Sequence, residues 1–255
     1  MLKEIIIAIQ SYAEAHSFIV KHRLWKWILI TGIIYAVLFF ASLYFFWITS
    51  KGVIEFVLNA TGLTSWLLQF KESFWGLIIL IIRIGVQLIL FFFYFSLFKY
   101  IFLIVGSPLF AYLSEKTAAI MEGRDYPFSF TQLIKDMVRG IKIALRNCLW
   151  QTVYSVSILI LSFIPVVGLA TIGIAFLIEC YYLGFSMLDY SCERNKLSPS
   201  ESIEFISKHK GLAIGNGMVF YLMHLVFIVG WILAPTYAVI AATLSLYKAK
   251  HYQLP

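Results

Sequence analysis

Four cations recur at helical spacing near the middle of the chain. They follow one another at intervals of four, three and four residues, which places them on one face of a helix over Thr131 to Asn147, with apolar side chains opposite. A basic amphipathic helix of this kind lies in the headgroup plane of a membrane and binds anionic lipid. A solvated face without a lipid role, and a funnel that concentrates anions near a pore, are the alternatives. The four cations are Lys135, Arg139, Lys142 and Arg146.

Two further cations interrupt the apolar run from Phe74 to Tyr112. Arg83 and Lys99 are sixteen residues apart, about 24 Å along a helix, which is less than the roughly 30 Å of a hydrocarbon core. Both could snorkel to opposite interfaces. Alternatively Arg83 points inward and lines a pathway, because charges inside membrane helices mark ion routes. Glu179 is then either a group that returns to the headgroups or an ion-pair partner of Arg83 in an oligomer.

The side chains that enzymes and metal sites use are scattered. The five histidines lie far from paired carboxylates and from metal-ligand spacing, and the three cysteines form neither a disulfide framework nor a zinc pattern. The sequence also contains no glycine-rich loop with a lysine to cradle nucleotide phosphates. It therefore predicts no catalytic residues, no metal and no cofactor.

The composition is that of an integral membrane protein. Hydrophobic residues make up 61% of the chain and charged residues 13%, whereas a soluble domain is roughly half apolar and a quarter charged. The formal net charge is +7, but the cations lie at the ends of apolar runs, which is the pattern of Lys and Arg retained on the cytoplasmic side of a membrane. The charge therefore predicts an orientation in a membrane and no nucleic-acid partner.

Two long transmembrane spans are expected between residues 27 and 114. The first covers Trp27 to Ser50, an uncharged run of 24 residues, which crosses a core of about 30 Å. Residues 1–26 are expected to form an amphipathic helix at the cytoplasmic surface, because the cations just before the span place the N-terminus inside. The second span is expected to stop where Gly106 and Pro108 break the apolar run.

Two later apolar stretches are interrupted near their centres. One runs from Asn147 to Ile178 and contains "PVVG", and the other runs from Gly211 to Tyr247 and contains "GWILAP". A proline at bilayer depth leaves a backbone group that no water satisfies, so each stretch is expected to be a helical hairpin that enters from the cytoplasm, turns and returns. A polar surface helix precedes each hairpin, which gives a pseudo-repeat over residues 130–189 and 198–247. The predicted fold is an all-α integral membrane protein with two long transmembrane helices, two broken, hemi-penetrating hairpins and amphipathic surface helices, with both termini cytoplasmic.

The order of these segments resembles a known family. The stretches "SPLFAYLSEK", "FSMLDYSCERNKLSPSESI" at Phe185 to Ile203, and "LAPTYAVIAATL" are similar to the bacterial CysZ-type sulfate permeases, which share a domain with the eukaryotic etoposide-induced membrane protein. The resemblance covers about Glu14 to Tyr247, and its best motif is "LDY" at Leu188 to Tyr190. It implies two full spans, two hemi-penetrating hairpins, an oligomer built from dimers and a place in the bacterial inner membrane.

The resemblance also implies that sulfate binds through a Gly-Leu-Arg-Arg turn before the first span. Here the matching stretch is "RLWKW": Leu24 fits, Arg23 stands where glycine is expected, and Lys26 keeps the charge of the second arginine. Trp25 replaces the first arginine, so the planar fork that grips an oxyanion with two hydrogen bonds is lost there. Positive-inside anchoring, with tryptophans at the interface, is the alternative explanation of the same cluster.

Two functions are compatible with these features. The first is a permease or channel for sulfate or a similar oxyanion that serves sulfur assimilation, with Arg23, Leu24, Lys26 and Arg83 as substrate-binding candidates. The second is a non-transport scaffold or lipid-interacting protein of the same fold, which the basic surface helices support equally well.

Overall fold

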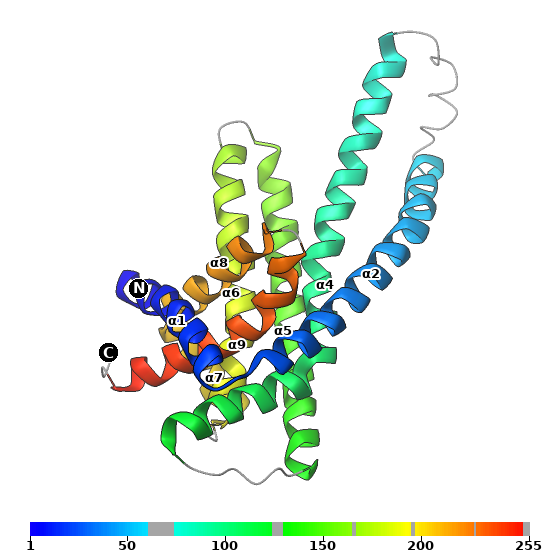
Figure 1. Ribbon diagram of the computed structural model, residues 1–255. Coiled ribbons are helices and arrows are strands. Elements are labelled where there is room, and N and C mark those ends of the chain that lie inside the picture. Colours follow the sequence, from blue (N-terminus) through cyan, green and yellow to red (C-terminus); the bar gives the residue numbers. More distant parts are fainter. Residues whose placement is uncertain (61–73, 124–129, 165–166, 195–196, 227, 252–255) are drawn as a thin grey trace. The chain divides into compact units, whose positions relative to one another are not determined.

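The part of the chain that the structure describes is built from helices. A computed structural model describes residues 1–60, 74–123, 130–164, 167–194, 197–226 and 228–251, and Figure 1 traces them. The chain divides into two compact units, one formed by Met1–Ala36 with Tyr100–Pro255 and the other by Val37–Lys99. In chain order the helices are α1 (Leu2–Lys21), α2 (Trp25–Ala60), α4 (Phe74–Glu122), α5 (Phe130–Ser162), α6 (Val167–Arg194), α7 (Pro199–Lys208), α8 (Lys210–His224) and α9 (Val229–His251).

Five of the described helices contain a stretch that is long and apolar enough to cross a membrane. α8 has 15 residues, about 22 Å, and does not belong to this set. The chain is therefore an all-α, multi-pass membrane protein, which confirms the predicted fold class. The five stretches are Trp25–Val53 in α2, Ile84–Glu122 in α4, Met137–Ser162 in α5, Val167–Glu193 in α6 and Val229–Ala249 in α9.

α4 continues through the residues that were expected to end it. It runs to Glu122 with Pro108 in its interior, so the prediction of a stop at Gly106 and Pro108 is wrong. Pro108 has no N–H to donate to the Ile104 carbonyl, but the Ser107 hydroxyl donates to that carbonyl at 2.8 Å. A serine side chain thus satisfies the acceptor that proline leaves open, which is how membrane helices tolerate proline.

Both predicted hairpins contain a break between two helices. α5 ends at Ser162 and α6 begins at Val167, so the break coincides with "PVVG", of which Pro165 and Val166 lie outside the described residues. The second break lies between His224 and Val229, ahead of the predicted "GWILAP", and Pro235 is inside α9. A further difference is that the predicted surface helix over 131–147 and the first limb of its hairpin form one helix, α5, because neither glycine nor proline separates them.

α8 packs unusually close to α6 through small residues. A Cβ at Gly217 would lie 2.5 Å from the carbonyl carbon of Cys180, and a Cβ at Gly184 would lie 2.8 Å from the carbonyl carbon of Ala213. Such distances are possible only for glycine, and close backbone approach of this kind is how helices associate inside membranes, where apolar burial alone gives no advantage over lipid. The glycines therefore define the α6–α8 contact.

α1 packs its small and polar face against α8 and α9. Ala8 and Ala15 are fully buried, and a Cβ at Gly215 of α8 would lie 2.8 Å from the Ala8 Cβ. The Tyr12 hydroxyl donates to the Asn216 carbonyl at 2.8 Å, and His16 Nδ1 lies 2.6 Å from the Tyr237 hydroxyl. The N-terminal helix is thus bound firmly to the second hairpin.

In the unit Val37–Lys99, aromatic rings of α2 and α4 pack against one another, and apolar side chains face outward. The ring of Phe46 in α2 lies 5.4 Å from that of Phe91 and 5.3 Å from that of Tyr94 in α4. Outward-facing side chains such as Phe40 and Trp47 are exposed. An exposed surface of this composition is suited to lipid or to further helices rather than to water.

Candidate functional site

α1 ends in a turn that reverses the chain just before α2. The N–H of Leu24 donates to the Ile19 carbonyl at 3.1 Å, and the N–H of Arg23 donates to the Val20 carbonyl at 3.4 Å. This is the hydrogen-bond pattern of a Schellman motif with His22 as the C-cap. Arg23 has a φ of 55°, the left-handed conformation that the motif requires at this position and that glycine adopts most easily. The turn geometry therefore explains why glycine is expected at this place in the resembled motif.

One side chain of the turn is buried in the protein, and three are exposed. Leu24 is 2% exposed and fixes the turn to the protein interior. Arg23, Trp25 and Lys26 are exposed, so two solvent-accessible cations lie within four residues of each other around the N-terminus of α2. A helix N-terminus adds a partial positive charge of its own. Together these groups form a cationic corner that can bind an anion, which we call the cationic turn (Arg23 to Trp27).

A variant at Arg23 separates backbone strain from charge. Replacing Arg23 with glycine is expected to raise the free energy of unfolding by about 0.5–1 kcal/mol, because glycine adopts a positive φ without a Cβ clash. Replacing it with alanine removes the same guanidinium but keeps the Cβ, and gives no such gain. Unfolding in mixed detergent and SDS micelles, followed by circular dichroism, measures both variants. A glycine variant no more stable than the alanine variant would contradict the left-handed turn.

Lys116 of α4 lies next to the cationic turn and was not among the candidates from sequence. Its Nζ is 5.6 Å from the centroid of the Trp27 ring and 5.7 Å from that of Tyr112, and the two rings are 4.6 Å apart. The signal in the sequence is the spacing of Tyr112 and Lys116, four residues and one helical turn apart in "SPLFAYLSEK". That spacing shows that the two side chains share a face, but it does not show that Trp27 faces them.

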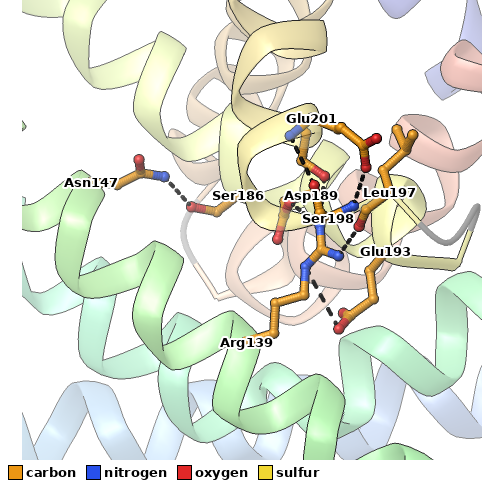
Figure 2. A network of polar contacts seen from close by, with 9 residues as sticks. Arg139, Asn147, Ser186, Asp189, Glu193, Leu197, Ser198 and Glu201 are labelled. Atoms are coloured by element: carbon orange, nitrogen blue, oxygen red, sulfur yellow. Dashed lines mark hydrogen bonds and ion pairs between the residues drawn. The ribbon is translucent and has the colours of Figure 1, made fainter.

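Arg139 is the centre of a buried ionic network, which Figure 2 shows. Its Nη2 donates to Asp189 Oδ1 at 3.0 Å and to the Ser202 hydroxyl at 2.5 Å, and its Nη1 donates to the Leu197 carbonyl. Its Nε lies 3.7 Å from Glu193 Oε1. We call these residues the Arg139 network. It ties α5 to α6 and to the segment that leads into α7.

The network corrects the prediction that Arg139 belongs to a lipid-facing basic surface. The side chains of Arg139 and Asp189 are only 12% and 3% exposed. Arg139 and Arg146 are seven residues apart, as are Lys135 and Lys142, so each pair stacks along α5, and the arginines lie about 40° around the helix from the lysines. The two lysines are exposed, whereas Arg146 is half-buried. Helical spacing alone could not reveal this division, because the carboxylates that attract Arg139 come from another helix.

The best motif of the resemblance has a structural explanation in the same place. Asp189 of "LDY" accepts a hydrogen bond from Arg139, and the hydroxyl of the adjacent Tyr190 donates to the Leu103 carbonyl at 3.1 Å. The motif thus connects α6 with both α5 and α4. It stabilises the fold rather than presenting groups to a ligand.

α7 begins in a capping box next to the Arg139 network. The Ser198 N–H donates to Glu201 Oε2 at 2.6 Å, and the Glu201 N–H donates to the Ser198 hydroxyl at 3.3 Å, as Figure 2 shows. The hydrogen bonds from the Ser198 N–H and hydroxyl lower the pKa of the Glu201 carboxyl below its usual value. The capping box fixes where α7 starts.

A row of polar side chains joins α4, α5, α6 and α8. The Tyr100 hydroxyl donates to Gln151 Oε1 at 2.5 Å, the Gln151 amide donates to Glu179 Oε1, and the Tyr221 hydroxyl donates to Glu179 Oε2 at 2.7 Å. Both carboxylate oxygens therefore accept hydrogen bonds from neutral donors, as buried polar groups require. The expected ion pair between Glu179 and Arg83 stays a prediction, because the side chain of Arg83 lies outside the described part of the chain.

Lys99, the other cation of the second span, is buried, with 7% of its surface exposed. Its role as an ion-pair candidate also stays a prediction. Among the described residues, no group of three or more His, Cys, Asp or Glu side chains is arranged to hold a metal ion.

Comparison with known proteins identifies the family. The family described as "Sulfate transporter CysZ/Etoposide-induced protein 2.4" matches residues 11–235, which include the cationic turn and the Arg139 network. Proteins named "Sulfate transporter CysZ" are similar to this chain: that of Pseudomonas aeruginosa (strain LESB58) is 28% identical over 185 residues, 72% of either chain. That of Pseudomonas fluorescens (strain SBW25) is 29% identical over 143 residues, 55% of this chain and 56% of the relative. That of Pseudomonas syringae pv. tomato (strain DC3000) is 26% identical over 184 residues, 71% of this chain and 69% of the relative. The chain therefore belongs to the family of sulfate transporter CysZ and etoposide-induced protein 2.4.

Proposed function

We propose that this protein transports sulfate across a bacterial plasma membrane and that the anion binds first at the cationic turn. The names of the relatives support sulfate as the substrate, and the family is one of transporters rather than enzymes. The observation that supports the location is the exposure of Arg23 and Lys26 at the N-terminus of α2, held there by a buried Leu24.

The chemistry of the turn suits a dianion. The guanidinium of Arg23 offers a planar fork of N–H donors that matches two oxygens of an oxyanion, and Lys26 offers a mobile point charge. The first N–H groups of a helix lack carbonyl partners within the helix and favour anions there, although in α2 the N–H of Trp27 already donates to the Leu24 carbonyl. Trp25 contributes no charge and is suited to the membrane interface.

The position of the protein in the membrane follows from the same cations and from helix lengths. Arg23 and Lys26 lie at the start of the first span, so by the positive-inside rule we expect the N-terminus in the cytoplasm. α8, with about 22 Å of length, is too short to cross a core of about 30 Å. We therefore expect the hairpin of α8 and α9 to enter from the cytoplasm and return. The helices α5 and α6 are each long enough to cross, and for their hairpin the same expectation rests on the resemblance alone.

An oligomer is expected from the surface of the long helices. α2 has 36 residues, about 54 Å of helix, which exceeds the hydrocarbon thickness by more than half. Apolar side chains such as Phe45, Trp47 and Phe56 remain exposed along it. Helices of a second copy would cover this surface, which agrees with the dimer-based oligomer that the resemblance implies.

Uptake of radiolabelled sulfate into proteoliposomes tests the proposed function. We expect saturable uptake that excess unlabelled sulfate inhibits and chloride and phosphate do not. The double variant Arg23→Ala/Lys26→Ala is expected to lose uptake at least about tenfold, since two charge-assisted contacts are removed.

The matched control is Lys135→Ala/Lys142→Ala, which removes two exposed cations from α5 and should leave sulfate uptake unchanged. Equal uptake by wild type, double variant and empty vesicles would contradict transport and favour a scaffold or lipid-interacting protein. Equal loss in both double variants would mean that total charge, and not the turn, governs uptake.

A further inference from the structure

The aromatic pair Trp27 and Tyr112 holds a third cation against the cationic turn. Tyr112 and Lys116 lie one turn apart on α4, and their side chains meet Trp27 in the first turn of α2. The Lys116 ammonium is almost equidistant from the two ring centroids, at 5.6 and 5.7 Å. Both distances are within the range of an attractive cation–π interaction.

Trp27 is fixed relative to Arg23 and Lys26 by the backbone. Its N–H donates to the Leu24 carbonyl at 3.0 Å, and Leu24 is anchored in the interior. The ring that positions Lys116 is therefore attached to the same short segment that presents the other two cations. Lys116 therefore lies beside the segment that carries Arg23 and Lys26.

The bonding state of Lys116 leaves it able to bind a ligand. Within the described residues, Lys116 contacts the two ring faces and forms no hydrogen bond or ion pair. A ring face attracts the charge but accepts none of the three N–H bonds in the manner of an oxygen. The side chain is half-buried, so solvent reaches it. An oxyanion next to the turn would provide the oxygen acceptors that the rings do not.

The negative charge of a dianion at the cationic turn would be better balanced by three cations than by two. The cationic turn carries two cations, Arg23 and Lys26, and Lys26 is a point charge without the bidentate fork. Sulfate carries two negative charges and four oxygens, and two flexible exposed cations bind such an ion weakly in water. A lysine whose position is set by two rings adds charge at a small cost in lost side-chain freedom.

We propose that Lys116 is a specificity-determining residue of the sulfate site, the third cation that contacts the dianion together with Arg23 and Lys26. This rests on the proposed function of the cationic turn. Divalent oxyanions benefit most from a third cation, so Lys116 favours sulfate over monovalent anions.

Equilibrium binding of radiolabelled sulfate to the purified, detergent-solubilised protein tests the role of Lys116. Lys116→Gln is expected to raise the Kd for sulfate about five- to tenfold, the effect of removing one close charge pair from a partly solvated site. Lys116→Arg keeps the charge and still stacks on the rings, and its Kd should stay within about twofold of wild type. Lys142→Gln, an exposed lysine on α5, is the matched control and should leave the Kd unchanged. The advantage of sulfate over chloride as competitor should shrink in Lys116→Gln alone.

A purely structural role of Lys116 would give a different result. The cation–π contact would then only hold α4 to α2, so Lys116→Gln would lower the unfolding temperature and leave the Kd of the folded protein as in wild type, which would overturn the inference. If Lys116→Gln does not give a monodisperse protein, Lys116→Met keeps an apolar stem over the rings, and an unchanged Kd there overturns the inference equally. Loss of binding in Arg23→Ala/Lys26→Ala with no effect at Lys116 would leave the proposed function intact. Absence of saturable binding by wild type would refute both.

Discussion

Replacing Arg139 with alanine is expected to lower the free energy of unfolding by about 3–5 kcal/mol, the usual cost of leaving a buried charge without its partner. Asp189 would keep its buried position, 3% exposed, and would lose the guanidinium that stands 3.0 Å away. Glu193 and the Ser202 hydroxyl would lose the same partner. SDS titration in detergent micelles, followed by circular dichroism, measures the change.

The control for Arg139 lies one turn further along α5. Lys142 is exposed, and Lys142→Ala should change the unfolding free energy by no more than about 0.5 kcal/mol. A double-mutant cycle between Arg139→Ala and Asp189→Ala should give a coupling of about 1–3 kcal/mol, because the two side chains are in direct contact. If Arg139→Ala were as mild as Lys142→Ala, the side chain would face lipid or solvent after all.

Replacing Gly217 with alanine is expected to destabilise the protein by more than about 3 kcal/mol, beyond the usual range for an oversized residue in a packed interior. The added Cβ would lie 2.5 Å from the Cys180 carbonyl carbon and 2.6 Å from the Cys180 Cα. Those atoms belong to the backbone of α6, so no side-chain rotation relieves the overlap and the two helices must separate. Size-exclusion chromatography of the purified variant should show loss of the monodisperse peak.

Gly173 provides the comparison for Gly217. It lies inside α6, and a Cβ there meets no other atom within 4 Å. Gly173→Ala should therefore gain about 0.5–1 kcal/mol from helix propensity. Similar behaviour of the two alanine variants would show that α6 and α8 do not approach as closely as described.

Composition and hydrophobic patterning predicted the class of the fold, because both reflect whether the helices are surrounded by water or by lipid. The charge-free run at Trp27 predicted α2, because such a run is a local feature of consecutive residues. Pro108 predicts the end of a helix, but α4 continues through it. The hydroxyl of the preceding Ser107 donates to the carbonyl that the proline leaves without a partner. The second break was placed at "GWILAP" on the same reasoning, whereas the chain turns between His224 and Val229.

The residues of the candidate site differ in the same way: some are close together in the sequence, and others are brought together only by the fold. Arg23, Leu24 and Lys26 lie in one short segment, so a motif could point to them. Lys116 is 89 residues from Trp27 in the sequence, and helical spacing cannot bring those two together. Arg139 was assigned to a membrane surface because its own helix is amphipathic, but Asp189, fifty residues later, determines where its guanidinium points. Tertiary partners thus decide what a regular charge pattern means.

The turn at Arg23 also has a mechanical consequence. Its hydrogen bonds attach the segment that carries the two exposed cations to the last turn of α1. α1 is itself bound to α8 and α9 through Tyr12 and His16. The position of the two cations therefore depends on the position of the second hairpin, α8 and α9. If that hairpin tilts, Arg23 and Lys26 tilt with it, and no separate signal between the two is needed.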